Sequence, residues 1–208
     1  MYKIHVFENT ELNDGFQYSL NVLDNNSNWY TKFLIKKLKN QNKISSVSFQ
    51  EENLFFAKGN NLAFDKFSGE SKYVLLLNSD IKIQSADWLQ LLIDKLENNT
   101  AVGAIAYGAV MEKPIRADGY AILVRSKLYE KFRLEEKFQW WWGITKLEAQ
   151  ILNDGFEVLA IKNHNNKLIH YGGKSGKAWK NSTGTGIDIN EANTWFNRGV
   201  QIIENIEE

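Results

Sequence analysis

The stretch from Tyr73 to Trp88 constrains the fold more than any other part of this chain. It opens with five apolar residues, Tyr73–Leu77, and runs into the polar triplet Asn78-Ser79-Asp80. An unbroken apolar run of this length that ends in a polar turn is typical of a strand buried on both faces. Asp80 therefore follows the carboxyl end of a buried strand, where open α/β sheets bind their ligands. A carboxylate at that position can supply the oxygen ligand that a hard divalent cation prefers.

The remaining sequence alternates between strand and helix patterns. Apolar runs predict strands over residues 2–7, 20–23, 44–49, 102–110, 119–124 and 156–161. Helical spacing predicts helices over 29–38, within 54–67, and over 87–96 (with Ser85 as its cap), 126–132 and 143–153. After a mobile loop over 171–186, Asp188 is expected to cap a last helix with Ala192, Trp195, Phe196, Val200 and Ile203. This order predicts an α/β fold, with a mostly parallel central sheet flanked by helices, in one domain over residues 1–208.

The composition excludes several classes of protein. Lys plus Arg and Asp plus Glu each number 25, so no global basic field favours nucleic acid as a partner. The absence of Cys excludes disulfides, thiolate chemistry and zinc held by cysteines. The N-terminus lacks the apolar segment of a signal peptide, and no apolar stretch reaches the roughly 18 residues that span a bilayer. We therefore expect a cytoplasmic protein, either complete or a domain of a larger enzyme.

Three segments, in this order, resemble motifs of the family 2 glycosyltransferases, which have the GT-A fold. Val22 to Ser27 is similar to the family's V-D-N-x-S, and Glu51 to Asn61 is similar to its N-x-G-F-A-x-G-N-N. Leu77 to Asp80 is similar to the L-N-P-D form of its D-x-D motif. Weaker similarity continues at Ala117 to Arg125 and at Ile169 to Ser175, the latter resembling a late H-x-G-G-x-S. The resemblance implies a nucleotide-binding half over about 1–100 and an acceptor half over about 101–208.

The resemblance implies a metal site that holds the diphosphate of a nucleotide sugar. Asp80 and His170 would bind Mn²⁺ or Mg²⁺, and the cation would offset the charge on the departing diphosphate. Asn78 occupies the first position of the D-x-D motif and offers only a neutral oxygen, with Ser79 between the two. Alternatively, Asn78-Ser79-Asp80 is merely a turn, and His170 a lone histidine near a strand end.

The other donor contacts also follow from the resemblance. Asp24 would accept a hydrogen bond from the base, which suits uracil N3–H or guanine N1–H, although it could instead cap a helix. We favour a UDP-sugar. The further residues expected at the base, ribose, phosphates or sugar are Asn9, Thr10, Asn26, Lys58, Asn61, Gly119, Tyr120 and Lys174, the last in a loop that could close over the diphosphate.

The chain departs from the family at the catalytic base. Alignment back from Leu152 to Phe156 places Gly143 and Ile144 where the family carries a Glu-Asp pair, and neither residue can take a proton. The replacements left open are Glu148, one helical turn further on, Glu135 or Glu136, and a retaining reaction that needs no such base. Of these, Glu148 is the one that we favour. Asp118, which with Gly119 and Tyr120 is expected to line the sugar pocket, is a further catalytic candidate.

Three consecutive tryptophans, Trp140, Trp141 and Trp142, form the least ordinary local feature. They cannot all face the core from one helix or strand, and an exposed aromatic face can stack on a sugar ring. We therefore expect them to bind the acceptor, while the alternative places two in the core and one at the surface.

The leading functional hypothesis is a metal-dependent glycosyltransferase that acts on a hydroxyl group of a glycan or glycoconjugate. A second is a GT-A domain that lost catalysis and binds sugars or nucleotides, because Gly143 and Ile144 replace the expected base. A third directs transfer to modified DNA or to protein, and a nucleotidyltransferase ranks last because no Gly-rich phosphate loop follows the first strand.

Overall fold

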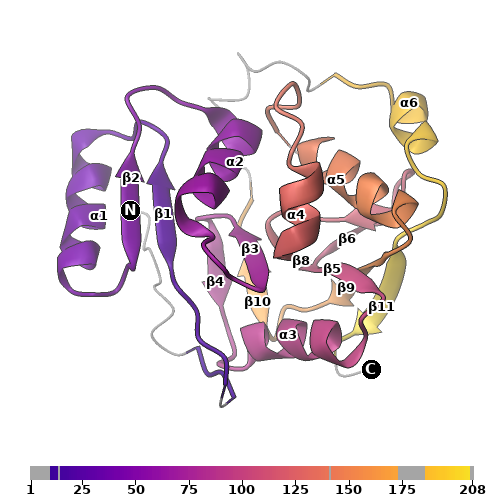
Figure 1. The fold of residues 1–208 in the computed structure, drawn as a ribbon, viewed down its shortest axis with the longest axis horizontal. Coiled ribbons are helices and arrows are strands. Elements are labelled where there is room, and N and C mark those ends of the chain that lie inside the picture. Colours follow the sequence, from indigo (N-terminus) through magenta and orange to yellow (C-terminus); the bar gives the residue numbers. More distant parts are fainter. Residues whose placement is uncertain (1–9, 14, 141, 173–185, 207–208) are drawn as a thin grey trace.

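The computed structural model describes residues 10–13, 15–140, 142–172 and 186–206. Figure 1 shows a central five-stranded sheet with the strand order β11-β9-β5-β8-β3. Its strands are β3 (Tyr73–Leu77), β5 (Val102–Tyr107), β8 (Ala121–Arg125), β9 (Glu157–Asn163) and β11 (Gln201–Asn205). β5, β9 and β11 are parallel, whereas β8 runs antiparallel to both β5 and β3. Four of the five strands therefore point in one direction, and β8 is the reversed one.

β3 has the predicted bounds but a different position in the sheet. Leu76 and Val74 pack against one apolar cluster. The alternate residues Tyr73, Leu75 and Leu77 pack against another, so both faces meet the core as predicted. The strand lies at the end of the five-stranded order, however, and only Leu76 is fully buried. β5 is the middle strand of this order, and all six of its residues are buried.

Three short strand pairs accompany the central sheet. β1 (Asn21–Asp24) is parallel to β2 (Ser46–Phe49), β4 (Ile81–Ile83) is antiparallel to β10 (Leu168–His170), and β6 (Ala109–Val110) is antiparallel to β7 (Arg116–Ala117). The strand predicted over 102–110 thus divides into β5 and β6. Gly108 separates them with φ of +96°, a conformation that L side chains rarely adopt.

Helices cover both faces of the central sheet (Figure 1). They are α1 (Trp29–Asn40), α2 (Phe55–Phe67), α3 (Trp88–Asn98), α4 (Ser126–Phe132), α5 (Trp142–Asn153) and α6 (Ile189–Thr194). α2, α4 and α5 contribute to the apolar cluster on one face, and α3 contributes to the cluster on the other. α5 ends at the predicted glycine, since Gly155 has φ of +97° and its N–H donates to the Leu152 carbonyl. None of the helices in the described part of the chain is long and apolar enough to cross a membrane.

The prediction of a long last helix was wrong. α6 ends at Thr194, and β11 follows from Gln201 in parallel pairing with β9. Ile202 packs against one sheet cluster and Ile203 against the other, so β11 buries alternate side chains as a strand does. Helical spacing from Ala192 to Ile203 was therefore misleading, because Ile203 lies in this strand and Val200 directly precedes it.

Two further expectations need comment. Ser85 does not cap α3, because the N-cap residue is Asp87 and no side chain makes a capping hydrogen bond there. The Ser85 hydroxyl instead donates to the Asp87 carboxylate. The predicted strand over 2–7, and residues 173–185 of the mobile loop predicted over 171–186, lie outside the described residues.

Candidate active site

Asp80 and His170 lie side by side at the end of β3. Pairing of β4 with β10 places His170 opposite Ile81, and the Tyr171 N–H donates to the Asp80 carbonyl over 2.9 Å. As a result, His170 Nε2 lies 3.3 Å from Asp80 Oδ1. The two side chains are 24% and 15% exposed, respectively, so both can be reached from solvent.

The spacing of this pair fits two neighbouring ligands of one divalent cation. Ligand atoms at adjacent corners of an octahedron around Mg²⁺ lie about 3 Å apart. Among the residues that the structure describes, no third His, Cys, Asp or Glu completes a metal-binding group. A cation held by two protein ligands leaves its other positions to phosphate oxygens and water, as is usual where a cation binds together with a phosphorylated substrate.

Tyr120 forms one wall beside the pair. Its ring stacks on the His170 ring, with centroids 4.2 Å apart and planes 20° apart, and its carbonyl accepts from the Asn78 N–H over 2.8 Å. Its hydroxyl contacts His164 Nε2, while His164 Nδ1 lies 3.0 Å from the Lys162 carbonyl. Because a carbonyl only accepts, Nδ1 carries the proton and Nε2 accepts from Tyr120. Burial lowers the pKa of His164 and raises that of Tyr120, so both groups are neutral at pH 7.

Asp118 is a half-buried carboxylate next to this cluster. Its N–H donates to the Gly108 carbonyl over 2.9 Å, which fixes the connection between β7 and β8. Burial raises the pKa of Asp118, and the charge of His170 and the Gly119 N–H act in the opposite direction. The coupling to His170 means that Asp118 belongs to the same electrostatic cluster as the candidate metal ligands.

Ile144 fills the position where the resemblance implies a catalytic aspartate. It is buried, and its Cγ1 would lie only 2.7 Å from a Cβ added at Gly119. Gly119 therefore allows a close approach between α5 and the connection that carries Asp118. Asp118, which carries a carboxylate, directly precedes Gly119, the residue against which Ile144 packs.

Glu148 lies deeper, beneath Ala117. Its side chain is 0% exposed, Oε2 accepts from the Ala117 N–H over 3.0 Å, and Oε1 has no hydrogen-bond partner among the described residues. Burial raises the pKa of Glu148 to about 8, although the Ala117 N–H and Arg116 oppose the increase. An acceptor molecule does not reach this carboxyl group in the present conformation.

The segment that follows β1 is joined to the start of α2. Asp24 is buried, and its Oδ2 accepts from the Ser27 N–H over 3.1 Å. It does not cap α1, because Asn28 does so by accepting from Thr31. Asn25 donates to the Phe55 carbonyl over 3.0 Å and accepts from the Leu54 N–H over 3.3 Å. The structure thus brings together two of the motifs that are far apart in the sequence.

Asn61 serves the fold rather than an open binding site. Its amide oxygen accepts from the Tyr129 hydroxyl and the Leu134 N–H, at 3.0 and 3.1 Å, and its amide nitrogen donates to the Leu134 carbonyl at 2.8 Å. The same nitrogen lies 3.3 Å from Glu136 Oε1. These contacts engage the buried amide inside the protein and hold residues 129–136 against α2, a different role from the predicted phosphate contact.

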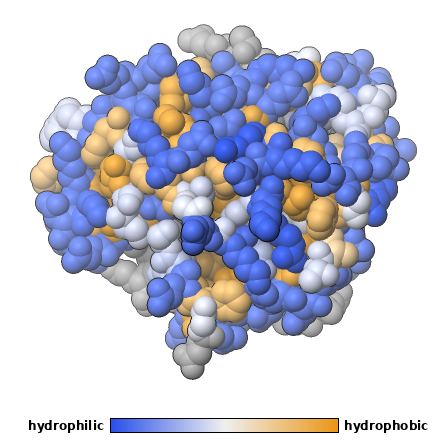
Figure 2. Space-filling model, viewed as in Figure 1, coloured by the Kyte–Doolittle hydropathy of each residue, from blue (hydrophilic) through white to orange (hydrophobic). Residues whose placement is uncertain are grey.

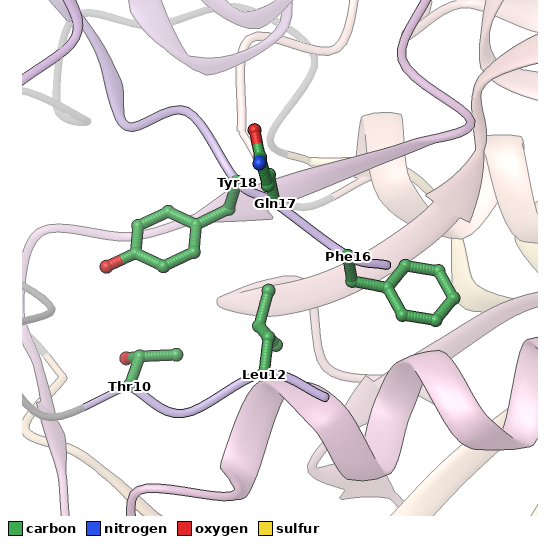
Figure 3. A pocket seen from close by; sticks show the side chains of 5 residues that line it. All are labelled: Thr10, Leu12, Phe16, Gln17 and Tyr18. Atoms are coloured by element: carbon green, nitrogen blue, oxygen red, sulfur yellow. The ribbon is translucent and has the colours of Figure 1, made fainter. Parts of the chain in front are cut away.

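Other predicted donor residues lie at the surface. Asn26 accepts from Lys32, and Lys58 lies 3.9 Å from Glu52. The Thr10 hydroxyl accepts from Trp88 Nε1 over 3.0 Å and lies beside a surface hollow of about 330 Å³. Figure 3 shows Thr10, Leu12 and Tyr18 around this hollow, which Phe16 and Gln17 also line.

Of the consecutive tryptophans, Trp142 contributes to packing. Trp142 is buried, stands edge-on to Trp195 with centroids 6.3 Å apart, and lies under the Arg116 guanidinium at 5.4 Å. The Trp140 side chain is half-buried, and its indole N–H has no hydrogen-bond partner among the described residues. Trp142 therefore offers no open aromatic face for stacking.

Three predicted site residues, Asn9, Trp141 and Lys174, lie outside the described residues. Sequence reasoning missed the Tyr120–His164 hydrogen bond and the role of Asn25. Asn25 lies between Asp24 and Asn26 in the first motif, so the sequence did point to this segment. The motif does not reveal that the Asn25 amide, and not that of Asn26, bonds to the start of α2.

Comparison with known proteins matches residues 11–156, more than half of the chain, to the family described as "Glycosyl transferase family 2". No curated protein sequence matches significantly. Among solved structures, mannosyltransferase PcManGT from Pyrobaculum calidifontis, in complex with GDP-Man and Mn²⁺, is 16% identical with a TM-score of 0.61, covering 78% of this chain and 50% of its own. GalNAc-T7 with UDP, GalNAc and Mn²⁺ is 10% identical with a TM-score of 0.56, covering 67% of this chain and 35% of its own.

The catalytic domain of Drosophila beta1,4galactosyltransferase 7, in complex with xylobiose, aligns over more of both chains. It is 14% identical with a TM-score of 0.50, and the alignment covers 92% of this chain and 84% of that one. Identities this low show a shared fold. The chain spans only half the length of the mannosyltransferase and about a third of GalNAc-T7.

Proposed function

The chain belongs to glycosyl transferase family 2 and adopts the GT-A fold, and from this premise we propose that it transfers one sugar from a nucleotide diphosphate sugar to a hydroxyl group. The observation that carries the proposal is the 3.3 Å approach of Asp80 to His170 at the end of β3. Both are residues that the family motifs led us to expect as metal ligands, which supports the proposal. The acceptor in this proposal is a glycan or glycoconjugate, and the domain division at about residue 100 is part of the same proposal.

Asp80 and His170 would hold Mn²⁺ or Mg²⁺, and the cation would stabilise the negative charge of the departing diphosphate. An imidazole ligand suits a transition metal better than it suits Mg²⁺. Two of the structures of similar fold were solved with Mn²⁺, which also favours testing this ion first. Asn78 can add only a neutral oxygen.

Asp24 would recognise the base, with its carboxylate accepting an N–H of uracil. The Ser27 N–H already holds Oδ2, which orients the carboxylate and leaves Oδ1 as the atom for the base. A UDP-sugar is favoured because uracil N3–H is a donor, and a GDP-sugar is the closest competitor because guanine N1–H is one as well.

Asp118 is the carboxylate that we propose as catalytic base. It is half-buried and coupled to His170, and it stands one residue from Gly119, against which Ile144 packs in place of the family's aspartate. Burial raises its pKa, which makes the carboxylate a stronger base for the acceptor hydroxyl. Glu148 is fully enclosed, and Glu136 contacts Asn61 away from this cluster, so neither is preferred.

A thermal-shift screen of UDP, GDP, CDP and dTDP tests the donor site, each with Mn²⁺ and with EDTA. A ligand that binds only the folded protein raises its melting temperature by mass action. We expect a shift with UDP that EDTA and Asp80→Asn both abolish, whereas Asp65→Asn, a change in an exposed surface ion pair, retains it. No shift with any nucleotide would contradict the proposal.

A second measurement tests the base. Asp118→Asn should lower kcat about 10²–10⁴-fold and leave the nucleotide-dependent thermal shift in place. Glu148→Gln serves as the control and should retain transfer activity. Loss of activity in the Glu148 variant alone would instead support the hypothesis that Glu148 is the base.

A binding module without catalysis is the second candidate, and the burial of Ile144 at the expected base position favours it. It predicts the same thermal shift but no transfer and no donor hydrolysis above background. Metal-dependent hydrolysis that Asp80→Asn abolishes would remove this candidate.

A further inference from the structure

Helix α1 exposes a cluster of aromatic side chains. Trp29 is 79% exposed, Phe33 56% and Tyr30 43%, and the rings of Trp29 and Tyr30 meet edge-on with centroids 5.8 Å apart. Trp29 and Phe33 are one helical turn apart and therefore share a face. Ile35 is buried on the opposite side, where α1 packs against β2. Large apolar groups gathered on one exposed face mark an interaction site.

The same helix is strongly basic. Residues 25–50 contain five lysines, no Arg and no Asp or Glu, although the whole chain has equal numbers of acidic and basic residues. Four of these lysines belong to α1: Lys32, Lys36, Lys37 and Lys39. Between residues that the structure describes, no ion pair involves a lysine of α1. The positive charge of the helix is therefore not neutralised by such ion pairs.

The aromatic and basic side chains combine on the outward face. Lys37 follows Phe33 by one turn and so continues the face of Trp29 and Phe33, whereas the Lys36 ammonium lies beside it, 5.5 Å from the Phe49 ring centroid of β2. In Figure 1, α1 lies at the edge of the molecule opposite α6. Figure 2 shows pale and orange atoms interrupting the hydrophilic surface on that same side. Within the part of the chain that the structure describes, Trp29, Tyr30 and Phe33 stay exposed on this face.

We infer that α1 is a docking helix that lies on an anionic lipid surface. An amphipathic helix with Trp and Phe on its apolar side and Lys beside them binds the interface between headgroups and acyl chains. Trp and Tyr rings favour this depth, and lysines bury their methylene stems while the ammonium groups stay at the charged headgroups. This inference does not depend on the proposed transfer activity.

The lack of arginine in residues 25–50 favours lipid over nucleic acid as the partner of α1. Arginine pairs bidentately with phosphates and stacks on bases, whereas lysine acts as a compact point charge. Juxtamembrane lysines respond to the negative surface potential of anionic lipid without any defined geometry. The four flexible lysines of α1, on the same helix as an exposed tryptophan, therefore fit a fluid anionic surface better than they fit a base-stacking groove.

Cosedimentation of the whole chain with lipid vesicles tests the inference. We expect binding to phosphatidylcholine vesicles that contain about 30 mol% phosphatidylglycerol, and much weaker binding to pure phosphatidylcholine. Raising the salt concentration to about 1 M should release the protein, because the Debye length falls to about 3 Å.

Variants of α1 separate the two contributions. Lys36→Gln with Lys37→Gln should weaken partitioning about 25-fold, from about 1 kcal/mol for each lysine. Trp29→Ser with Phe33→Ser should weaken it at least about tenfold, because these side chains no longer enter the interface. Trp29→Phe alone keeps an aromatic ring and should bind as the parent chain does. The melting temperatures of all these variants should stay near that of the parent chain, because the positions are exposed.

Ile189→Ser is the matched control. It removes an apolar side chain that is 52% exposed, but from α6 at the opposite edge of the molecule (Figure 1). This variant should bind anionic vesicles as the parent chain does. Equal binding by all variants, absence of vesicle binding, or binding of an oligonucleotide instead of vesicles through the same lysines would each overturn the inference.

Discussion

Replacement of Glu148 by Gln should change how the stability of the protein depends on pH. Glu148 is completely buried, and burial raises its pKa to about 8 from an ordinary value of 4.5. Below about pH 4.5 the carboxyl group is protonated in both the folded and the unfolded chain, so it imposes no cost. Between about pH 4.5 and pH 8 the carboxyl group ionises only in the unfolded chain, so the free energy of unfolding falls progressively as the pH rises. Above about pH 8 this decrease has reached its full size.

The structure sets the size of this effect. The difference between the two pKa values corresponds to about 5 kcal/mol, at about 1.4 kcal/mol for each pKa unit. The Gln side chain keeps an oxygen that accepts from the Ala117 N–H. Its NH2 group takes the place of Oε1, the carboxyl oxygen that has no hydrogen-bond partner among the described residues. We therefore expect Glu148→Gln to match the parent protein near pH 4, and to exceed its free energy of unfolding by several kcal/mol above about pH 8.

Urea unfolding followed by tryptophan fluorescence, at several pH values, measures this difference. Subtracting the two profiles cancels the titration of groups far from residue 148. Glu130→Gln is the control, because Glu130 is exposed on α4 and should give a difference independent of pH. Parallel profiles for the parent protein and Glu148→Gln would refute the reasoning.

Three further predictions concern the packing around the site. Gly119→Ala should destabilise the fold by about 1–3 kcal/mol because the new Cβ meets Cγ1 of Ile144, and the loss should be smaller in the background of Ile144→Ala, which removes that atom, as a double-mutant cycle in urea unfolding would show. Asn61→Ala should cost about 3 kcal/mol, measured in the same way, because it leaves buried partners of the amide without a hydrogen bond. Tyr120→Phe should cost about 1 kcal/mol by losing the hydroxyl contact to His164, yet calorimetric titration with Mn²⁺ should show little change, because the phenyl ring still stacks beside the candidate metal ligands.

Elements with strong local signals could be predicted from the sequence. β3, α4 and α5 have the expected bounds to within a residue, because continuous apolar runs and regular helical spacing report burial directly. The end of the chain could not be read in this way. Ile202 and Ile203 form a strand only because the free edge of β9 is available for pairing, and that edge is created by residues far away in the sequence.

The candidate site could likewise be predicted only in part. The motif that ends in Asp80 identified a carboxylate at a strand end, and the structure brings His170 to it through strand pairing. The fates of Asn61 and Trp142 could not be predicted, since one amide or one indole in a motif does not reveal which side of an element faces the core. Their burial depends on how residues 129–136 and α6 pack against α2 and α5.

The Asp80–His170 pair depends on a very small piece of secondary structure. β4 and β10 contribute three residues each and pair only with one another within the described chain. A ribbon of this size opens far more readily than the central sheet, since local opening free energies fall as buried apolar contacts become fewer. An ion held across both strands would oppose that opening by its own binding free energy. The amide hydrogen of Tyr171, which is bonded to the Asp80 carbonyl, would then exchange with solvent more slowly as Mn²⁺ is added, and its exchange rate would report how firmly the ribbon is closed.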